Sequence, residues 1–431
     1  MWRILENAWK IDELRSRVLF TLGMIAVFRL GCQVPTPGVD PDQISNIFQQ
    51  GDAGVLGFLN MFSGGALERF SVFSLGIAPY INASIIMQLL VYVVPYLEKL
   101  QKEEGSEGRK KINMYTKYGT IVLGAIQALG IATWLQSMDG VVLPTMERWE
   151  FMFMTVVTLS AGTAFIMWLG EQMTNKGIGN GMSLLITVGI LATFPAAIME
   201  TVMVTDIQDP KSVIRLAAIT VICLFVVAAI CFMQDGVRKI PIQHARRNAS
   251  GRSAAGLKSF IPLRVNMAGV IPIIFASSIM MFPPLILQWA QNRFNQEWIV
   301  TATVWMGHTH FFHMAIYALL IIFFTYFYTA IQLNPTEMAD NLKKYGGFIP
   351  GIRAGRKTAD FIDRIVTRIT LCGALFLAIV SLVPPLMSKY MNVTFYFGGT
   401  SLLIVVSVML DTVRQMESYM VTRHYDGFMK S

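Results

Sequence analysis

The chain has 431 residues, of which 54% are hydrophobic and only 14% are charged, and its formal net charge is +8. Soluble globular proteins carry more charge and less apolar surface, so this composition excludes a soluble globular protein. It indicates a polytopic membrane protein, in which the excess of lysine and arginine is a signal of topology.

Residues 1–17 are charged throughout and lack a small-residue cleavage site, so we expect an amphipathic cytoplasmic segment rather than a signal peptide. Apolar runs of about 20 residues, long enough to cross roughly 30 Å of hydrocarbon as helix, recur along the rest of the chain. Ten spans are predicted: 18–37, 76–96, 115–137, 151–170, 182–203, 213–233, 265–290, 308–331, 366–387 and 397–413. We therefore expect an all-α integral membrane protein of ten transmembrane helices.

A glycine-rich segment, 54–73, lies between the first two spans. Its apolar part, about 55–70, has half the length needed to cross a membrane. Two interpretations stay open. The segment is either a short half-helix resting in a protein-lined cavity at membrane depth or a surface loop against the outer leaflet.

Basic residues gather in alternate connections. Residues 97–117 carry 6 lysines and arginines, 234–264 carry 7 and 334–368 carry 7, whereas 38–75 contain only Arg69. The positive-inside rule then predicts that both termini are cytoplasmic. We expect 234–264 and 334–368 to form a basic cytoplasmic protrusion. Topological signalling accounts for much of this charge, and the remainder suits docking of an anionic or RNA-bearing partner.

Two motifs occur twice, once in each half of the chain. The pattern G-x-x-P-x-I-x-A-S-x-I-M begins at Gly76 and again at Gly269, and G-x-S-L-L-I begins at Gly181 and again at Gly399. These matches predict a duplication, with halves 18–203 and 213–413, an external hinge at 204–212 and a cytoplasmic tail at 414–431. Five spans per half is an odd number, so the second half enters the membrane from the opposite side. Inverted repeats commonly build their functional path where they meet at the midplane.

Branched aliphatic residues occupy equivalent positions in the four duplicated spans. A collar of such side chains dewets a narrow pore and blocks ions without fixed charge. The alternative is that these residues only pack helices together or face lipid. The duplicated positions are Ile81 and Ile274, and Ile186 and Ile404. Ile85 and Ile190 each lie four residues farther along and share a helix face with Ile81 and Ile186, so the candidate pore ring consists of these six isoleucines.

Catalysis finds little support in the sequence. Residues 251–259 resemble a phosphate loop, but Leu257 interrupts the motif and an all-helical chain offers no strand before it. Histidines at 308, 310 and 313 are placed at a water-exposed span start, and the four cysteines fall inside spans as small core residues. We therefore expect no enzyme activity, no cofactor and no metal. A secondary transporter with inverted repeats is the alternative function, but carboxylates at the midplane, which would favour it, are absent.

Five stretches of the chain resemble the bacterial branch of the SecY family of protein-conducting channels: GIAPYINASI at 76–85, GEQMTNKGIGNG at 170–181, VNMAGVIP at 265–272, NPTEMAD at 334–340 and FIPGIR at 348–353. The resemblance covers essentially the whole chain. It implies a passive channel of the cytoplasmic membrane that passes unfolded secretory polypeptides and releases hydrophobic segments laterally into lipid.

The resemblance also implies roles for particular residues. The pore ring matches the six isoleucines named above, and residues 55–70 resemble a plug that includes Leu56, Phe58, Leu59, Met61, Phe62, Gly64 and Gly65. A lateral gate for signal sequences is expected between the second and third spans and the seventh and eighth, with Asn82, Gln127 and Asn266 as weaker candidates. Arg353, with Arg246 and Arg247 in the other basic loop, is expected to dock the SecA motor ATPase or the ribosome. Small SecE and SecG subunits are the remaining partners that the resemblance implies.

Overall fold

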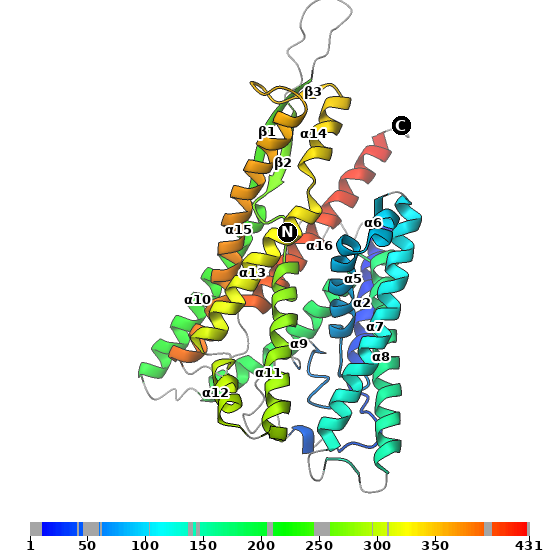
Figure 1. The fold of residues 1–431 in the computed structure, drawn as a ribbon, viewed down its shortest axis with the longest axis vertical. Coiled ribbons are helices and arrows are strands. Elements are labelled where there is room, and N and C mark those ends of the chain that lie inside the picture. Colours follow the sequence, from blue (N-terminus) through cyan, green and yellow to red (C-terminus); the bar gives the residue numbers. More distant parts are fainter. Residues whose placement is uncertain are drawn as a thin grey trace, which may run out of the picture.

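The computed structural model describes residues 11–40, 43–45, 60, 63–102, 104–136, 141–143, 147–204, 210–244, 259–294, 296–307, 310–391 and 399–428. Most of these residues are helical, and the helices form two groups that lie side by side (Figure 1). The fold is therefore the mainly α-helical membrane architecture that the composition predicts.

The first group belongs to the N-terminal half. Its helices are α2 (Asp12–Gly31), α5 (Ala78–Val93), α6 (Pro95–Lys102), α7 (Gly105–Gln136), α8 (Arg148–Lys176) and α9 (Gly181–Val204). Helix α8 begins at a capping box, in which the side chains of Glu147 and Glu150 satisfy each other's backbone N–H groups. Helix α5 ends at Val94, which is extended because the residue before a proline is disfavoured in helical geometry.

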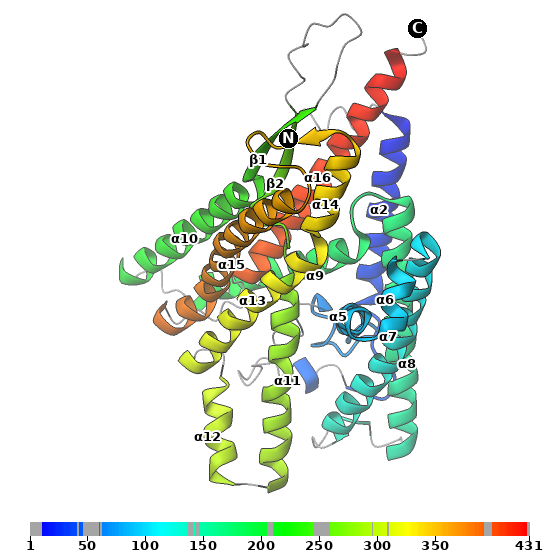
Figure 2. The ribbon, with the colours of Figure 1, turned by 45° about the horizontal axis from the view of Figure 1, so that its top comes forward.

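The second group belongs to the C-terminal half. Its helices are α10 (Pro210–Asp235), α11 (Ile271–Phe294), α12 (Glu297–Trp305), α13 (Phe311–Gln332), α14 (Pro335–Lys344), α15 (Arg356–Met391) and α16 (Gly399–Phe428). A small antiparallel sheet with the strand order β2-β1-β3 stands at one end of the molecule (Figures 1 and 2). Its strands are β1 (Val237–His244), β2 (Ser259–Arg264) and β3 (Gly347–Phe348).

The duplicated motifs occupy equivalent structural positions. Gly76 and Gly269, which open the first motif, both take left-handed backbone conformations, with φ of 54° and 62°, just before α5 and α11. Gly181 and Gly399, which open the second motif, are the first residues of α9 and α16. Among the described residues, the main contacts between the two halves join α5 to α11 and α9 to α16. The four helices that carry the repeats therefore form the boundary between the halves.

The predicted spans and the observed helices agree in place but differ in their ends. Each of the ten predicted ranges overlaps a helix. Within the described residues, six helices are long and apolar enough to cross a membrane, and the pair α5 and α6, bent by 100° between Val93 and Pro95, makes a seventh if the two form one span. The first helix begins at Asp12 rather than at residue 18, because charged residues continue a helix as readily as apolar ones once it leaves the hydrocarbon. The number of ten crossings stays a prediction.

The mainly helical chain also contains a small sheet that the sequence did not predict. The connection 234–264 contains the hairpin of β1 and β2, and 334–368 contains α14 and β3. Alternating exposed and buried residues in β2, with Leu263 inward between Pro262 and Arg264, form the sheet pattern. The suspected phosphate loop thus leads into a strand, whereas such a loop must lead into a helix.

Gly162 allows α8 to approach the chain that precedes α5. A Cβ atom at this position would lie 2.0 Å from the carbonyl oxygen of Val72. We expect Gly162→Ala to destabilise the protein by about 1–3 kcal/mol, the usual effect of overpacking, and to lower its melting temperature by several degrees. Gly130→Ala in α7 is the matched control, because its Cβ would meet no atom within 4 Å. Equal melting temperatures for the two variants would contradict this account.

Candidate functional site

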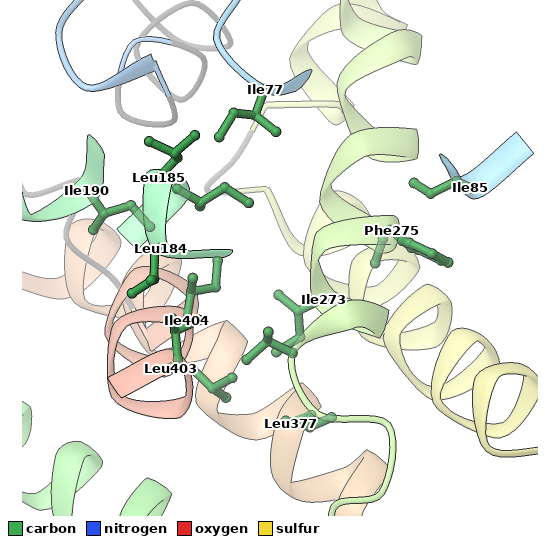
Figure 3. Packing of buried hydrophobic residues seen from close by; sticks show 14 of the residues in the cluster. Ile77, Ile85, Leu184, Leu185, Ile190, Ile273, Phe275, Leu377, Leu403 and Ile404 are labelled. Carbon is green, nitrogen blue, oxygen red and sulfur yellow. The ribbon is translucent and has the colours of Figure 1, made fainter. Parts of the chain in front are cut away.

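A large apolar cluster lies where the two halves meet. All six isoleucines of the candidate ring belong to it: Ile85, Ile186, Ile190 and Ile404 are buried members, and Ile81 and Ile274 are partly buried and pack against it. Figure 3 shows Leu184, Leu185 and Ile190 of α9 beside Leu403 and Ile404 of α16, with Ile273 and Phe275 of α11 and Ile85 of α5 farther to the right. The duplicated helices thus bring all six isoleucines into one hydrophobic region.

The cluster is much larger than the candidate ring. It also contains residues such as Leu377 and Ile321, which lie on α15 and α13. Membership therefore places the isoleucines in the interior and excludes a purely lipid-facing position for the four buried ones. The convergence of the six side chains on a single pore axis stays a prediction.

Two of the candidate gate amides, Asn82 and Asn266, belong to the elements that meet at the boundary between the two halves, α5 and the chain just before α11. Asn82 of α5 is 6% exposed, and its Nδ2 has no hydrogen-bond partner among the described residues. Asn266, just before α11, donates from Nδ2 to the carbonyl oxygen of Gly269 at 3.1 Å, while its Oδ1 has no partner within the same residues. A buried polar atom without a partner costs about 1–3 kcal/mol, so these amides hold unused bonding capacity at this boundary.

The contact between the two halves along α5 and α11 is small. Gln127 is half-buried on α7, whose neighbours are α5, α6 and α8, and the structure does not bring it to the α5–α11 contact. Helices α5 and α13 approach through the rings of Tyr92 and Phe327, whose centroids are 6.4 Å apart. The contact between α5 and α11 is far smaller than those that join α5 to α7 and α11 to α13. The two halves are therefore held together weakly along this line.

The described part of the candidate plug is buried. Gly64 and Gly65 lie within it, whereas Leu56, Phe58, Leu59, Met61 and Phe62 lie outside the described residues. Ser63, Ala66 and Phe70 are each no more than 2% exposed. Main-chain hydrogen bonds tie this segment to the chain that follows α2, from Thr36 N to the Phe70 carbonyl at 2.8 Å and from Val72 N to the Val34 carbonyl at 2.9 Å. Such burial favours a segment inside the protein over a loop on the outer leaflet.

The two basic connections pack into a single unit, the basic unit, which consists of β1, β2, β3, α14 and the first turns of α15. Strand β1 pairs with β3 through Gln243 and Phe348 and through His244 and Gly347. A small apolar core lies beneath the sheet, with Ile240, Leu263 and Ile362 buried in it, and Val265 and Leu333 pack against that core. This core fixes the relative positions of two loops that are far apart in the sequence.

Arg353 lies exposed on the basic unit, and its carbonyl oxygen accepts a hydrogen bond from the Thr358 hydroxyl at 3.1 Å. Arg246 and Arg247 lie outside the described residues. The remaining exposed cations of the unit are Arg238, Lys239, Arg264, Lys343, Lys344, Arg356, Lys357, Arg364 and Arg368. The unit thus presents a surface of predominantly positive charge.

An ionic network that the sequence did not predict joins the base of this unit to α16. Arg414 donates to the carboxylate of Asp235 at 2.5 Å and to the carbonyl oxygen of Gln234 at 2.9 Å. The carboxylate of Asp411 lies 3.7 Å from Arg414 and 3.7 Å from Arg264. The one sequence signal was that Asp235 and Asp411 fall at span boundaries, where carboxylates and arginines from different helices meet.

The described part of the chain offers no metal-binding chemistry. Within it, no three histidine, cysteine or acidic side chains gather closely enough to hold a metal ion. The cysteines Cys32, Cys223, Cys231 and Cys372 are all unpaired thiols.

Comparisons with known proteins match this architecture. The SecY family model matches residues 71–413. The protein translocase subunit SecY of Escherichia coli K12 is 45% identical over 421 residues, which are 97% of this chain and 95% of that protein. A solved structure of a protein-conducting channel aligns with a TM-score of 0.64 at 17% identity, covering 95% of this chain and 93% of that one. Sec61 in the canine ribosome-channel complex aligns with a TM-score of 0.61 at 15% identity and the same coverage.

The family match covers most of the chain, and the relative matches nearly all of it at an identity that two unrelated membrane proteins do not reach. The chain therefore belongs to the SecY family and is the pore-forming subunit of a protein translocation channel.

Proposed function

We propose that unfolded secretory polypeptides cross at a constriction formed by Ile81, Ile85, Ile186, Ile190, Ile274 and Ile404. The observation that carries this proposal is the presence of all six in one apolar cluster at the boundary between the duplicated halves. A short apolar constriction excludes ions by dewetting, yet it makes no specific hydrogen bond that would select one passing side chain over another. Membership of the SecY family also removes the secondary transporter weighed above.

Residues 55–70 act as the plug that seals the channel at rest. The burial of Ser63, Ala66 and Phe70 supports this role. The lateral gate opens along the weak contact between α5 and α11, where Asn82 and Asn266 carry unsatisfied amide groups. Hydrophobic segments leave through this opening into lipid, and signal sequences enter it. Gln127 on α7 is a more distant member of the gate.

The energy for transport comes from partners outside the membrane. The basic unit, with Arg353 on its surface and Arg246 and Arg247 in the same loop system, docks the SecA ATPase or the ribosome. The ribosome-bound complex of Sec61 supports the second partner. SecE and SecG complete the assembly. Both termini and the basic unit face the cytoplasm, because basic residues gather in alternate connections. The resemblance to the bacterial branch of the family implies that the chain resides in the cytoplasmic membrane.

The domain boundaries follow the repeats. Residues 1–17 form the amphipathic N-terminus, 18–203 and 213–413 the two inverted halves, 204–212 the external hinge and 414–431 the tail. Helix α9 ends at Val204 and α10 begins at Pro210, which supports the position of the hinge.

A crosslinking experiment tests the constriction. A stalled secretory precursor should crosslink to cysteine at Ile81→Cys and at Ile274→Cys, because a chain in transit must touch both halves of the ring. Phe225→Cys is the control, since Phe225 is 73% exposed on α10, away from the cluster. Crosslinking should be at least about tenfold weaker there, the difference expected between direct contact and chance collision. Failure at both isoleucines would refute the proposed constriction.

A further inference from the structure

Arg29 is an ionisable residue within an apolar helix, and its hydrogen bond to the candidate plug indicates a function. It lies near the C-terminal end of α2, half-buried, and its Nη1 donates a hydrogen bond to the carbonyl oxygen of Gly64 at 2.8 Å. Ionisable residues at membrane depth are expensive and are usually retained for function. The acceptor is a main-chain carbonyl, so the bond fixes the backbone of the candidate plug and does not depend on a particular side chain there.

Gly64 is confined by α9 as well. A Cβ atom on Gly64 would lie 2.9 Å from Cα of Gly189 and 3.1 Å from Nη1 of Arg29, and its φ of 71° is one that other residues rarely adopt. Gly189 belongs to α9 and directly precedes Ile190, a candidate ring residue that is fully buried. The backbone at Gly64 is therefore in close contact with both the guanidinium group of Arg29 and the helix that carries part of the proposed constriction.

The other bonds between α2 and this segment are different in kind. Cys32 Sγ lies 3.9 Å from the carbonyl oxygen of Ser63, and a thiol is a weak donor. The bonds at Thr36 and Val72 are between main-chain atoms, and so they persist whatever side chains are exchanged. Hydrogen bonds from a charged donor are roughly twice as strong as neutral ones. Arg69 of the segment also donates to Gln33 Oε1, but that bond is exposed to water, whereas the bond from Arg29 is partly buried. Arg29 is thus the side chain whose removal should loosen the segment most without touching its scaffold.

We propose that Arg29 is a positioning residue that holds the backbone at Gly64 against α9, and thereby keeps the segment 63–70 beside Ile190 in the resting channel. Displacement of the segment begins when this bond breaks. The inference rests on the proposed role of residues 55–70 as the plug.

The experiment measures resting ion conductance of the complete translocase complex reconstituted in lipid vesicles. Arg29→Met should raise it about tenfold, the effect on a closed-to-displaced equilibrium of losing a hydrogen bond to a charged group. Arg29→Lys keeps a charged donor and should restore most of the seal. Arg15→Met is the matched control on the same helix, because Arg15 pairs with Asp12 at an exposed site, and should leave conductance unchanged. A deletion of residues 55–65 marks the conductance of a channel without its plug.

A second readout follows the segment itself. With Ser63→Cys, the introduced thiol should form a disulfide with native Cys32 under a membrane-permeant oxidant, and Arg29→Met should slow that reaction severalfold. Gly64→Ala crowds the same contact, because the added Cβ would lie 2.9 Å from Cα of Gly189 and 3.1 Å from Nη1 of Arg29, and it should raise conductance as Arg29→Met does.

The outcomes separate the two proposals. If the deletion raises conductance and Arg29→Met leaves both conductance and disulfide rate at the wild-type level, the plug stands and the role of Arg29 is wrong. If the deletion itself leaves conductance unchanged, the plug and the role of Arg29 are both wrong. A rise with Arg15→Met equal to that with Arg29→Met would also overturn the inference.

Discussion

Arg353→Glu should abolish export of secretory precursors while the protein still accumulates and assembles in the membrane. Arg353 is exposed on the basic unit, and the described bond at this residue involves its carbonyl oxygen, so the substitution leaves that bond in place. Reversing one charge inside a docking surface replaces attraction by repulsion, and like-charge contacts in an interface cost several kcal/mol. The measurement is export of a model precursor in cells, together with copurification of the partner ATPase.

Lys357→Glu is the matched control for this prediction. Lys357 is also exposed, lies four positions along at the start of α15 and undergoes the same change of charge. Export should fall only partly, because the general field of the basic unit weakens by the same amount while the Arg353 side chain remains. Equal losses with the two variants would show that net charge alone matters, and normal export with Arg353→Glu would remove Arg353 from the docking surface.

Simultaneous replacement of Ile81 and Ile274 by serine should open the resting constriction to ions. Both side chains are partly buried at the edge of the central cluster, so the fold loses less than it would at Ile190 or Ile404. Burial of an isoleucine side chain contributes about 1.5–3 kcal/mol. Serine hydroxyl groups would let water enter the proposed constriction, and we expect the free-energy barrier to ions to fall by a similar amount. We expect conductance in reconstituted vesicles to rise roughly tenfold or more.

Ile86→Ser provides the control on the same helix as Ile81. Ile86 is 45% exposed, on a part of α5 outside the central cluster, so its replacement should leave the seal intact. Conductance that stays at the wild-type level in the double variant, with the complex assembled, would mean that other members of the cluster form the seal. A leak of equal size with Ile86→Ser would mean that general loosening of α5 is responsible.

The sequence predicts the helices well, because long apolar runs leave few alternatives once the solvent is hydrocarbon. The repeats predict equivalent glycines at the starts of paired helices. Gly181 and Gly399 are the first residues of α9 and α16, and the glycines before α5 and α11 both take a left-handed backbone conformation. The ring isoleucines could be nominated for the same reason. Their common membership in one cluster needed the structure, because periodicity along a helix does not say which neighbour a face will meet.

What the sequence does not contain are contacts between polar groups that are distant along the chain. The bond from Arg29 to Gly64 joins the end of α2 to the candidate plug, and their approach depends on the packing of α2 against α8 and α9. The pairing of β1 with β3 depends likewise on where α13, α14 and α15 bring the second loop. Short strands in a basic connection, interrupted by Pro241 and Pro262, carry too weak an alternating pattern to be predicted as a sheet.

The small core of the basic unit has a mechanical consequence. Val265, a few residues before α11, and Leu333, at the end of α13, both rest on it. Helices α11 and α13, which form the C-terminal side of the weak boundary between the two halves, are therefore both attached to this core. They also pack against each other. We propose that a partner docked on the basic unit displaces α11 and α13 as one body, which would widen the contact between α5 and α11 without any part of the partner entering the bilayer.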